Sequence, residues 1–440
     1  MENNEEFRHI LRYGTHAEQS YFLGRFESHY DLIMFNAHIV AYTPAGIAAF
    51  LVGKTKGKKY IIDPITHAFA HSPSKIKVEK EDGTLELKAS LKSLIHHFGD
   101  PVIKKAGKKS IIPDDFRDES ITKDFTLKVL DFQENILNRC IQESEYSKYL
   151  EQTSVHPEVL IPPYFYMTAV SYKDWLPINK IFIQIAKEEK PAQKIFGEIV
   201  ISQDMLPNRT ILDNLISNYK DSGCDGIFIW IDGFSELTAS KEDLDGFQYL
   251  LSGLANNIPI YNLYGSYYSI MLCKKGSLSG MCHGLHYGED REVTPVGGGI
   301  PRAKFYLPGV HSRLRYGEVA HSIFENKWVS VSDYRKHICW CETCQEVIED
   351  KVENFKKYGI EIRKITRSRS GQEMAFMILS SESKDRCIRH YLDNKKKEFE
   401  EIDLRNMTEL KDDLIENFEK FKETLGIENV GHLKIWYDTL

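Results

Sequence analysis

Three cysteines within six residues are the strongest chemical signal in the chain: Cys339, Cys341 and Cys344. A Cys-x-Cys-x-x-Cys cluster can place three thiolates around one tetrahedral zinc ion, which leaves one ligand to find. The best fourth ligand is His390, 46 positions after Cys344 (390 − 344), in a stretch with a helical pattern. Cys387 lies one turn earlier on the same helix and competes with it. A zinc ion with four protein ligands is closed, so we expect it to stabilise the fold rather than to react.

Three free thiols in a loop are the alternative, but thiols seldom cluster this way in a reduced protein without a metal. His337 is too close to Cys339 in the sequence to be a first choice as ligand. The four cysteines at 140, 224, 273 and 282 are scattered. That distribution is typical of a reducing cytoplasm rather than of a disulfide framework.

Carboxylates at the ends of apolar stretches form a second group of candidate residues. Asp63 and Asp232 each end such a stretch, and Glu289 and Asp290 follow another. Convergent carboxylates suit chemistry at a glycosidic carbon, where one attacks the anomeric carbon and another moves protons. Any one of these acids could instead cap the helix that follows it.

Aromatic and glycine residues near the last apolar stretches are candidates for substrate binding. They are Tyr261, Tyr264, Tyr287, Gly297, Gly298 and Gly299. Tyrosine rings can stack on a nucleobase, and loop glycines let backbone amides approach an anion or a flat base. The alternatives are tyrosines that line the edge of the core and a glycine loop that serves as a flexible lid.

The elements that would position these residues alternate between strands and helices. Seven strands are expected near residues 31, 59, 159, 196, 227, 258 and 282. Strands with near-continuous apolar character, separated by helices, predict a parallel sheet that is buried on both faces. An eighth strand in the polar, poorly patterned region 72–125 would close a (β/α)8 barrel. The active site of such a barrel lies at the carboxyl ends of the strands. An open doubly wound sheet is the second choice.

Composition bounds the class of protein. The 440 residues are 42% hydrophobic and 28% charged with a net charge of −7, which excludes a protein that coats nucleic acid by bulk charge. Local basic clusters remain, at residues 54–59, 104–109 and 363–369. No apolar run reaches the length of a membrane span, and the acidic N-terminus is unlike a secretory signal, so we expect a cytoplasmic protein.

The predicted domains follow from the same patterns. Residues 1–335 form the barrel, with a polar insertion near 72–125, residues 336–395 form a zinc-binding subdomain, and residues 396–440 form C-terminal helices.

These motifs together resemble the tRNA-guanine transglycosylase superfamily, over about residues 195–395 with Asp63 as an outlying match. The cysteine cluster with the later His390 matches the zinc signature, and the stretches 225–233, 261–265 and 284–290 resemble strands of the barrel. The resemblance implies a zinc-bearing (β/α)8 enzyme that exchanges guanine for a 7-deazaguanine. It makes Asp63 the general acid/base and Asp290 or Glu289 the nucleophile, with Asp232 as a rival.

The chain also departs from the family pattern. It has Asp-Pro-Ile-Thr-His-Ala at 63–68 where the family has Asp-Ser-Gly-Gly-Phe-Gln, and Pro-Pro-Tyr at 162–164 where the family has Asp-Glu-Cys. The gap from the third cysteine to the histidine is longer than usual. Such divergence resembles the DpdA branch, which places 7-deazaguanines into DNA.

The expected partners follow from that branch: nucleic acid, with DNA favoured over tRNA, a 7-deazaguanine base, a DNA-opening ATPase or nuclease, and a second copy of the chain in a homodimer, but no membrane. The first hypothesis is a glycosyltransferase that exchanges nucleobases through a covalent aspartyl intermediate. The second is a catalytically altered relative that binds a 7-deazapurine or a modified partner in phage defence. The third is a zinc-stabilised glycoside hydrolase with the same carboxylates.

Overall fold

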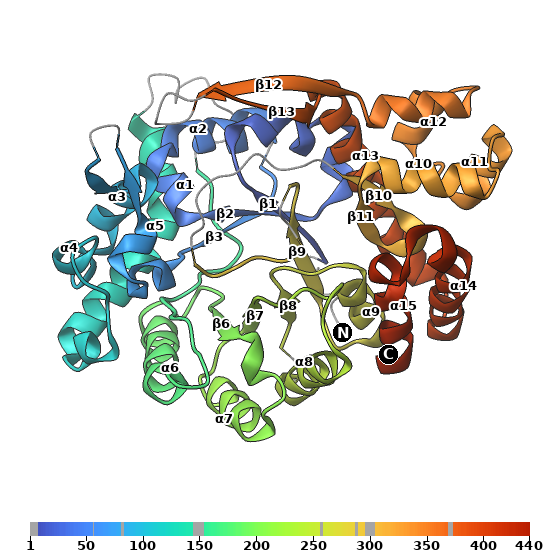
Figure 1. Ribbon diagram of the computed structural model, residues 1–440. Helices are drawn as coiled ribbons and strands as arrows, with labels where there is room; N and C mark the ends of the chain where they lie inside the picture. Colours follow the sequence, from blue (N-terminus) through green and yellow to red (C-terminus); the bar gives the residue numbers. More distant parts are fainter. Residues whose placement is uncertain are drawn as a thin grey trace. The chain divides into compact units, whose positions relative to one another are not determined.

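The computed structural model describes residues 8–55, 57–80, 83–143, 154–255, 258–286, 289–294, 304–367 and 373–440 (Figure 1). The chain divides into two compact units. The first comprises residues 1–235, 242–265 and 276–298, and the second comprises residues 236–241, 266–275 and 299–440. The domain boundaries expected at residues 335 and 395 stay predictions.

A seven-stranded parallel sheet forms the core of the first unit, in the order β3-β2-β1-β9-β8-β7-β6. Its strands are β1 (His9–Tyr13), β2 (Leu32–Asn36), β3 (Tyr60–Asp63), β6 (Phe196–Ser202), β7 (Gly226–Asp232), β8 (Ile260–Asn262) and β9 (Gly280–Gly284). The sheet curls, and α6, α7 and α8 lie along the outer side of β6, β7 and β8 (Figure 1). The predicted mixed α/β class with a parallel sheet is confirmed.

The first strand of this sheet, β1, was not among the seven expected stretches. It is short, and His9 and Arg12 interrupt its apolar pattern, although all five of its residues are buried. It pairs with β2 on one side and with β9 on the other. The poorly patterned region, where an eighth strand was expected, instead holds a separate antiparallel hairpin of β4 (Lys77–Glu79) and β5 (Leu85–Leu87). These three-residue strands are largely exposed.

Helices connect the strands of the first unit. They are α1 (Ala37–Tyr42), α2 (Pro44–Ala49), α3 (Ala89–Phe98), α4 (Val102–Lys105), α5 (Glu119–Glu143), α6 (Tyr172–Glu189), α7 (Arg209–Lys220) and α8 (Lys241–Leu254). α7 and α8 lie between β6 and β7 and between β7 and β8, where the alternating pattern predicts helices. In α7 the apolar residues recur every three to four positions, which gives one buried face, and the Asn208 side chain caps the first turn by accepting from the Ile211 amide.

An extended segment, residues 155–167, runs between the two edge strands β3 and β6. On one side the Glu158 amide donates to the Tyr60 carbonyl, at 2.9 Å. On the other side Leu160 and Met167 each form an isolated parallel bridge with the β6 side of the sheet. The strand predicted at 159–165 is therefore wrong as a continuous strand. Pro162 and Pro163 have no N–H to donate, so the ladder cannot run through them.

Side chains replace the missing strand partners of this segment. The amide of Gln133, on α5, donates to the Ile161 carbonyl at 2.7 Å and accepts from the Ile161 N–H at 3.0 Å. Asn138 makes the same pair of hydrogen bonds with Val155, and Asn179 makes it with Phe165. Buried backbone groups are costly when unpaired, so these three amides fix the path of the segment.

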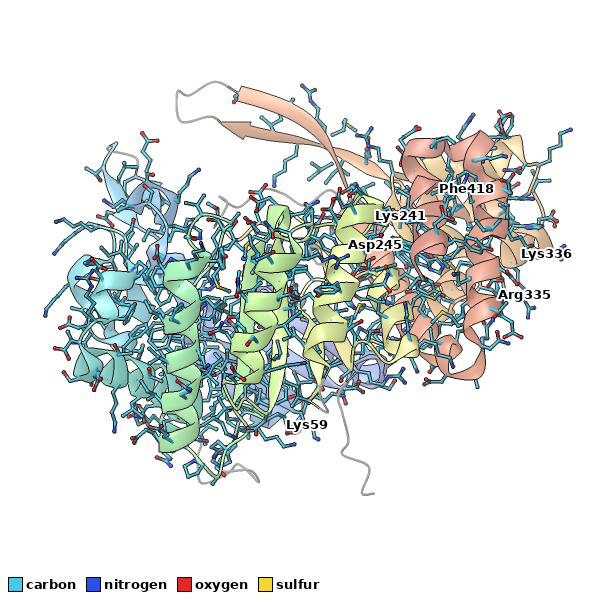
Figure 2. All side chains as sticks on the ribbon, turned by 90° about the horizontal axis from the view of Figure 1, so that it is seen from below. Lys59, Lys241, Asp245, Arg335, Lys336 and Phe418 are labelled. Atoms are coloured by element: carbon cyan, nitrogen blue, oxygen red, sulfur yellow. The ribbon has the colours of Figure 1, made fainter. Side chains whose placement is uncertain are left out.

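The second unit is built mainly from helices. They are α9 (Tyr267–Lys275), α10 (Tyr316–Glu325), α11 (Val331–His337), α12 (Glu342–Ile348), α13 (Ser381–Leu404), α14 (Met407–Leu425) and α15 (Ile427–Thr439). Two antiparallel hairpins complete it, β10 (Phe305–Leu307) with β11 (Ser312–Leu314) and β12 (Glu361–Arg367) with β13 (Glu373–Leu379). The predicted C-terminal helical segment is confirmed. Figure 2 shows the β12–β13 hairpin as a long arm.

Buried polar contacts join the early segments of the second unit to its C-terminal helices. The Glu236 carboxylate accepts from the amides of Ser266 and Ser269, at 2.8 and 3.2 Å, at the start of α9. The Trp436 indole donates to the Glu236 carbonyl at 2.9 Å. These bonds hold the residues around 236 and 266 in the same unit as α15.

Among the helices within the described ranges, none is long and apolar enough to cross a lipid bilayer.

Replacing Gln133 with leucine tests whether its amide replaces a strand partner. The change keeps the side-chain size but leaves the N–H and C=O of Ile161 without their partner, so we expect a loss of about 2 to 4 kcal/mol in the free energy of unfolding. Urea denaturation measures it. Gln142→Leu, an exposed position on the same helix, is the matched control and should change stability little. Equal effects of the two substitutions would contradict the proposed role.

Candidate metal centre and buried carboxylate cluster

The second unit contains a compact set of metal-ligating side chains. The ligand atoms of Cys339, Cys341, Cys344 and His390 all lie within 4.8 Å of one another, and all four residues are buried. His390 Nδ1 is 3.2 Å from Cys341 Sγ and 3.3 Å from Cys344 Sγ. Three thiolates and one imidazole at such separations fit a tetrahedral Cys3His zinc site. The predicted ligand set is compatible with a structural zinc site.

His390 is oriented by its other ring nitrogen. Nε2 lies 2.6 Å from the Tyr306 carbonyl, so this nitrogen carries the proton and donates it. Nδ1 is then left with the lone pair that a metal requires. The Phe305 ring stacks on the imidazole with a centroid distance of 4.2 Å and holds its plane.

The cysteines sit where backbone and hydroxyl donors stabilise thiolates. Cys341 precedes α12, and its Sγ accepts from the Cys344 amide at 3.4 Å, as an N-cap side chain does. The hydroxyls of Tyr334 and Tyr358 each lie 3.4 Å from Cys344 Sγ. Backbone and hydroxyl groups near the cluster therefore contact the sulfurs of Cys341 and Cys344.

The competing ligand lies outside the cluster. Cys387 is buried, and its Sγ contacts the Tyr358 carbonyl at 3.7 Å. Burial raises the pKa of this thiol to about 12, so it remains protonated. His337 stacks on Trp328 with a centroid distance of 4.7 Å. His390 is therefore the better candidate than Cys387 for the fourth ligand.

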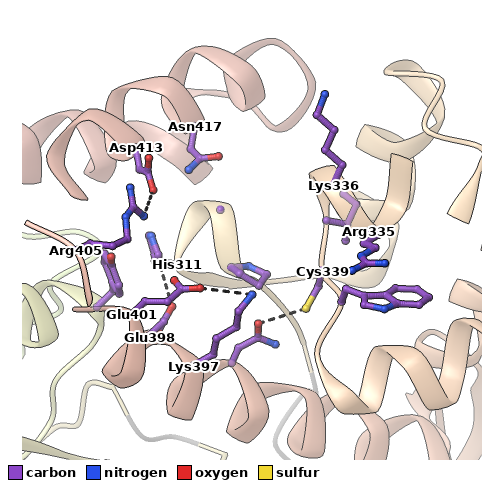
Figure 3. Close-up of a pocket in the computed structure, with 16 residues that line it drawn as sticks. His311, Arg335, Lys336, Cys339, Lys397, Glu398, Glu401, Arg405, Asp413 and Asn417 are labelled. Carbon is purple, nitrogen blue, oxygen red and sulfur yellow. Dashed lines mark hydrogen bonds and ion pairs between the residues drawn. The ribbon is translucent and has the colours of Figure 1, made fainter. Parts of the chain in front are cut away.

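A cavity of about 510 Å³ borders the metal cluster at Cys339 (Figure 3). Its wall carries Arg335 and Lys336, at the end of α11, and Glu398 and Glu401, on α13. The His311 ring donates from Nδ1 to the Glu398 carboxylate, at 2.8 Å. Both signs of charge line this cavity, so charge alone selects no ligand for it.

In the first unit, Asp63 is the centre of a buried polar cluster at the carboxyl ends of three neighbouring strands. Asp63 ends β3 and is fully buried. Its Oδ2 accepts from Arg12 Nη1 of β1 at 3.1 Å, and its Oδ1 accepts from the Tyr164 hydroxyl at 2.6 Å. Arg12 also donates to Asn36, the residue that pairs with Asp63 in the sheet register. Both carboxylate oxygens of Asp63 are thus fixed in place.

The turn after Asp63 is conformationally strained. Ile65 has φ of 47°, in the left-handed region that β-branched residues rarely adopt. Its amide donates to Asp63 Oδ1 at 3.0 Å. Strain of this kind persists only where the surroundings impose it, and it often marks a functional site.

A second carboxyl group, Glu198 on β6, lies close to this cluster and is 2% exposed. Among the described residues, neither of its carboxyl oxygens has a hydrogen-bond partner. Burial, and then the negative charge of Asp63, raises the pKa of Glu198 well above its usual value, although Arg12 opposes the shift. Burial beside Asp63 thus shifts the pKa of Glu198 toward retention of its proton.

Asp232 ends β7 and is half-buried. Its Oδ2 accepts from the Tyr166 hydroxyl at 2.8 Å, and its Oδ1 accepts from the Val293 amide at 2.6 Å. Tyr164 and Tyr166 therefore contact Asp63 and Asp232 from positions two residues apart on the same extended segment. The two predicted carboxylates are linked through this segment.

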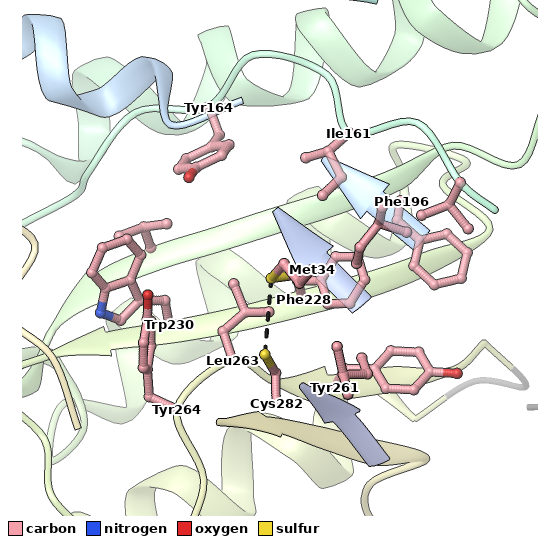
Figure 4. Close-up of a cluster of buried hydrophobic side chains, with 14 of the residues drawn as sticks. Met34, Ile161, Tyr164, Phe196, Phe228, Trp230, Tyr261, Leu263, Tyr264 and Cys282 are labelled. Carbon is pink, nitrogen blue, oxygen red and sulfur yellow. Dashed lines mark hydrogen bonds between the residues drawn. The ribbon is translucent and has the colours of Figure 1, made fainter. Parts of the chain in front are cut away.

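Aromatic rings surround the carboxylates. The His67 ring stacks on the Tyr164 ring with a centroid distance of 5.3 Å, and it meets the Trp230 ring edge-on with a centroid distance of 5.1 Å. The ring centroids of Tyr264 and Trp230 are 5.0 Å apart (Figure 4). Burial, reinforced by the neighbouring His71, lowers the pKa of His67 well below its usual value, so its ring is neutral. Flat neutral surfaces beside carboxylates suit a heteroaromatic ligand.

The two described tyrosine candidates have different surroundings. Tyr264 lies under the Arg12 guanidinium, with 4.8 Å from Cζ to the ring centroid, beside the Asp63 cluster. Tyr261 is fully buried in the apolar core, and its ring packs against Phe196 and Phe228 (Figure 4). That position matches the alternative of a tyrosine at the edge of the core.

The remaining candidates lie on or near the loop after β9. Glu289 is half-exposed and Asp290 is exposed. Tyr287, Gly297, Gly298 and Gly299 lie outside the described residues. Arg291 of the same loop donates to the Tyr264 hydroxyl at 3.3 Å, and its carbonyl accepts from the Trp230 indole at 3.0 Å. Arg291 thus brings this loop to the aromatic rings.

Several residues of the cluster were not identified from the sequence. They are Arg12, Asn36, Tyr164, Tyr166, Glu198 and Arg291. Glu198 did leave a signal, since it is the one charged residue in the apolar strand 195–201. Arg12 lies in a strand too short to be recognised by its pattern.

No protein-family model matches this chain, and no curated protein matches it. Function is therefore inferred from the residues of the two sites.

Metal analysis of the purified chain tests the Cys3His site. We expect about one zinc ion per chain, and the His390→Ala variant should lose it, because three ligands leave the site open. A structural zinc contributes on the order of 10 kcal/mol to folding, so thermal unfolding of the variant should begin at lower temperature. Cys387→Ala is the matched control and should keep the metal. Zinc retained by His390→Ala but lost by Cys387→Ala would reverse the assignment.

The buried Glu198 predicts a defined pH dependence of stability. Its pKa is raised in the folded state, so folding takes up a proton above the unfolded pKa and the folded state loses stability as pH rises. Glu198→Gln removes this ionisation, so its stability relative to wild type should increase by about 1.4 kcal/mol per pH unit from about pH 5 up to the folded-state pKa of Glu198. Urea denaturation across this range measures it. A constant difference between the two proteins at all pH values would show that Glu198 does not titrate in this way.

Proposed function

We propose that this chain is a nucleobase-exchange transglycosylase, a divergent member of the tRNA-guanine transglycosylase superfamily. It replaces guanine in nucleic acid, DNA in preference to tRNA, with a 7-deazaguanine base. The observation that carries the proposal is the buried Asp63, fixed by Arg12 and Tyr164 and linked through Tyr166 to a second carboxylate, Asp232. Two positioned carboxylates among neutral aromatic rings suit displacement at the anomeric carbon of a nucleoside.

The fold that we propose is a (β/α)8 barrel in which the segment 155–167 takes the place of one strand. The segment's hydrogen bond from Glu158 to Tyr60 on one side, and its bridges from Leu160 to Ile195 and from Met167 to Ile201 on the other, support this closure. In such a barrel, the carboxyl ends of the strands hold the active site. Asp63 and Asp232 end β3 and β7.

The proposed reaction proceeds in two displacements. A carboxylate attacks C1′ of the target guanosine, the C1′–N9 bond breaks, and guanine leaves with a proton from the acid/base group. The enzyme is then joined to the sugar through an ester. The incoming 7-deazaguanine gives a proton to the same acid/base group and attacks C1′, which releases the carboxylate.

Asp232 is the nucleophile that the contacts favour. It is half-buried, so a substrate can reach it, and Tyr166 and the Val293 amide orient both of its oxygens. Asp63 and the Tyr164 hydroxyl that donates to it together form the acid/base group: both Asp63 oxygens accept hydrogen bonds, so the hydroxyl supplies the proton to the leaving guanine and recovers it from the incoming base. Asp290 and Glu289 remain alternatives for the nucleophile from the family resemblance.

The metal has no step in this reaction. Cys339, Cys341, Cys344 and His390 would hold a zinc ion with no open position, so it would stabilise the second unit and supply no Lewis-acid chemistry.

A duplex substrate imposes one further requirement. A guanine within a base pair must be turned out of the helix before C1′ can be attacked, which costs a few kcal/mol. A DNA-opening ATPase or nuclease would supply this step as a partner. A second copy of the chain is the other expected partner.

One observation favours a second function. Both oxygens of Asp63 are already engaged by groups of the chain itself, and the residue is fully buried. A carboxylate in this state could serve to order a binding site without reacting. The chain would then bind a 7-deazapurine or a modified partner, in phage defence, without base exchange.

Exchange of radiolabelled guanine into plasmid DNA and into bulk tRNA, in parallel, tests the main proposal. We expect label in DNA, and a loss of at least about a hundredfold in rate for Asp63→Asn and Asp232→Asn, since each removes a group that acts in the reaction. Asp232→Asn should also lose the covalent adduct on a denaturing gel.

Asp174→Asn, an exposed position on α6, is the control and should keep full activity. Label in tRNA alone would assign the chain to the RNA-modifying enzymes. Full activity of Asp232→Asn with loss in Asp290→Asn would move the nucleophile to the loop. A zinc-loaded protein that labels neither substrate but binds a 7-deazaguanine would support the binding function.

A further inference from the structure

The β12–β13 hairpin is an arm with little support from the rest of its unit. Its two strands pair over seven residues each, from Glu361↔Leu379 to Arg367↔Glu373. Among the described elements, each of the two strands packs extensively only against the other. Figures 1 and 2 show it extending away from α12 and α13. A two-stranded ribbon is marginal by itself in water, so a surface of this kind is expected to gain a partner.

The base of the arm is fixed next to the metal centre. The Ser380 amide donates to the Ile360 carbonyl at 2.8 Å, and the Ser383 hydroxyl accepts from the Ile360 amide at 3.2 Å. Ser380 caps α13, the helix that also carries His390. The arm and its connection occupy residues 361–379, within the long interval between Cys344 and His390.

The arm carries exposed cations beside exposed apolar groups. Arg363 and Lys364 are exposed, and within the described part of the chain neither side chain forms an ion pair. Ile362, Ile365 and Met377 are 48%, 56% and 56% exposed. The segment 361–379 contains four basic and two acidic residues, a net charge of +2 in a chain of net charge −7. The local sign of charge therefore favours an anionic partner.

The two cations project to opposite faces of the ribbon because successive residues of a strand alternate. Each face then presents one cation together with apolar side chains, Arg363 with Ile365 and Met377, and Lys364 with Ile362. A ribbon that enters a duplex groove meets a phosphate backbone on each side. The major groove is wide enough to admit a two-stranded ribbon, and apolar side chains can contact or wedge between bases there or in the minor groove.

We propose that the β12–β13 arm binds duplex DNA by insertion into a groove. Arg363 and Lys364 contact the phosphates on its two sides, and Ile362, Ile365 and Met377 contact the base edges. This inference rests on the proposed function, and it adds that the nucleic-acid substrate is a duplex.

Association of two arms from two copies of the chain is disfavoured by the same residues. Edge pairing of identical ribbons would bring like charges of Arg363 and Lys364 together, and charged residues on a strand edge are a usual protection against such pairing.

Binding of a fluorescent guanine-containing duplex across a series of salt concentrations tests the proposal. We expect Arg363→Gln/Lys364→Gln to weaken duplex binding about tenfold at physiological salt. The slope of log K against log salt should fall by about 1.8, because each lost phosphate contact removes about 0.9. The matched control is Lys108→Gln/Lys109→Gln, an adjacent exposed pair with the same change of charge, and it should bind as wild type does.

The single strand of the same sequence and bulk tRNA are measured alongside, with sedimentation to report the oligomeric state. Unchanged duplex binding by the arm variant, or an equal loss in the control pair, would overturn the proposal. An equal loss on single strand and tRNA would also overturn it, since the groove of a DNA duplex would then not be what the arm recognises. A change from dimer to monomer with unchanged DNA affinity would assign the arm to contact between copies.

The guanine-exchange assay separates this inference from the function on which it rests. If the wild-type protein exchanges guanine and the arm variant keeps its duplex affinity, the role of the arm is refuted and the proposed activity stands. Arm-dependent duplex binding by a protein that exchanges no guanine would keep the arm and refute the activity.

Discussion

The hydrogen bonds that replace a strand ladder around Pro162 and Pro163 are the constraint on which the first unit depends. Prolines cannot donate to a ladder, so Gln133, Asn138 and Asn179 supply the missing partners from neighbouring helices. An amide side chain offers a donor and an acceptor at the spacing of a peptide group, which lets it substitute for a strand. With the segment fixed, its two tyrosine hydroxyls reach two different carboxylates.

A buried ion pair between Arg12 and Asp63 stabilises the carboxylate cluster. Arg12 and Asp63 are buried together, and removing one member of such a pair costs about 3 to 5 kcal/mol because the other is left uncompensated. Glu198 has no comparable charged partner, and burial raises its pKa well above the usual value, which lowers the cost of enclosing it. A left-handed Ile65 beside them is consistent with a site that function has shaped.

The second unit separates structural support from recognition. The buried cluster of Cys339, Cys341, Cys344 and His390, which is compatible with a structural zinc site, lies between α12 and α13, and the Thr343 amide and hydroxyl both donate to Asp393 between these helices. The same α13 anchors the base of the β12–β13 arm. Recognition, as we propose it, falls on exposed side chains of the arm that the fold of this unit does not need.

The sequence by itself determined the elements with local signals. Cysteine spacing identified the three sulfurs of the candidate metal site, because thiols within six residues can readily converge, and apolar runs identified β2, β3, β6 to β9 and the helices α7 and α8. Only the tertiary structure decided which distant residues meet. Arg12 reaches Asp63 because β1 lies beside β2 in the sheet, and the pKa of Glu198 is raised because this residue is enclosed near Asp63. Neither fact is local: a strand of five residues carries no recognisable period, and a pKa depends on neighbours that the chain brings together only when it folds.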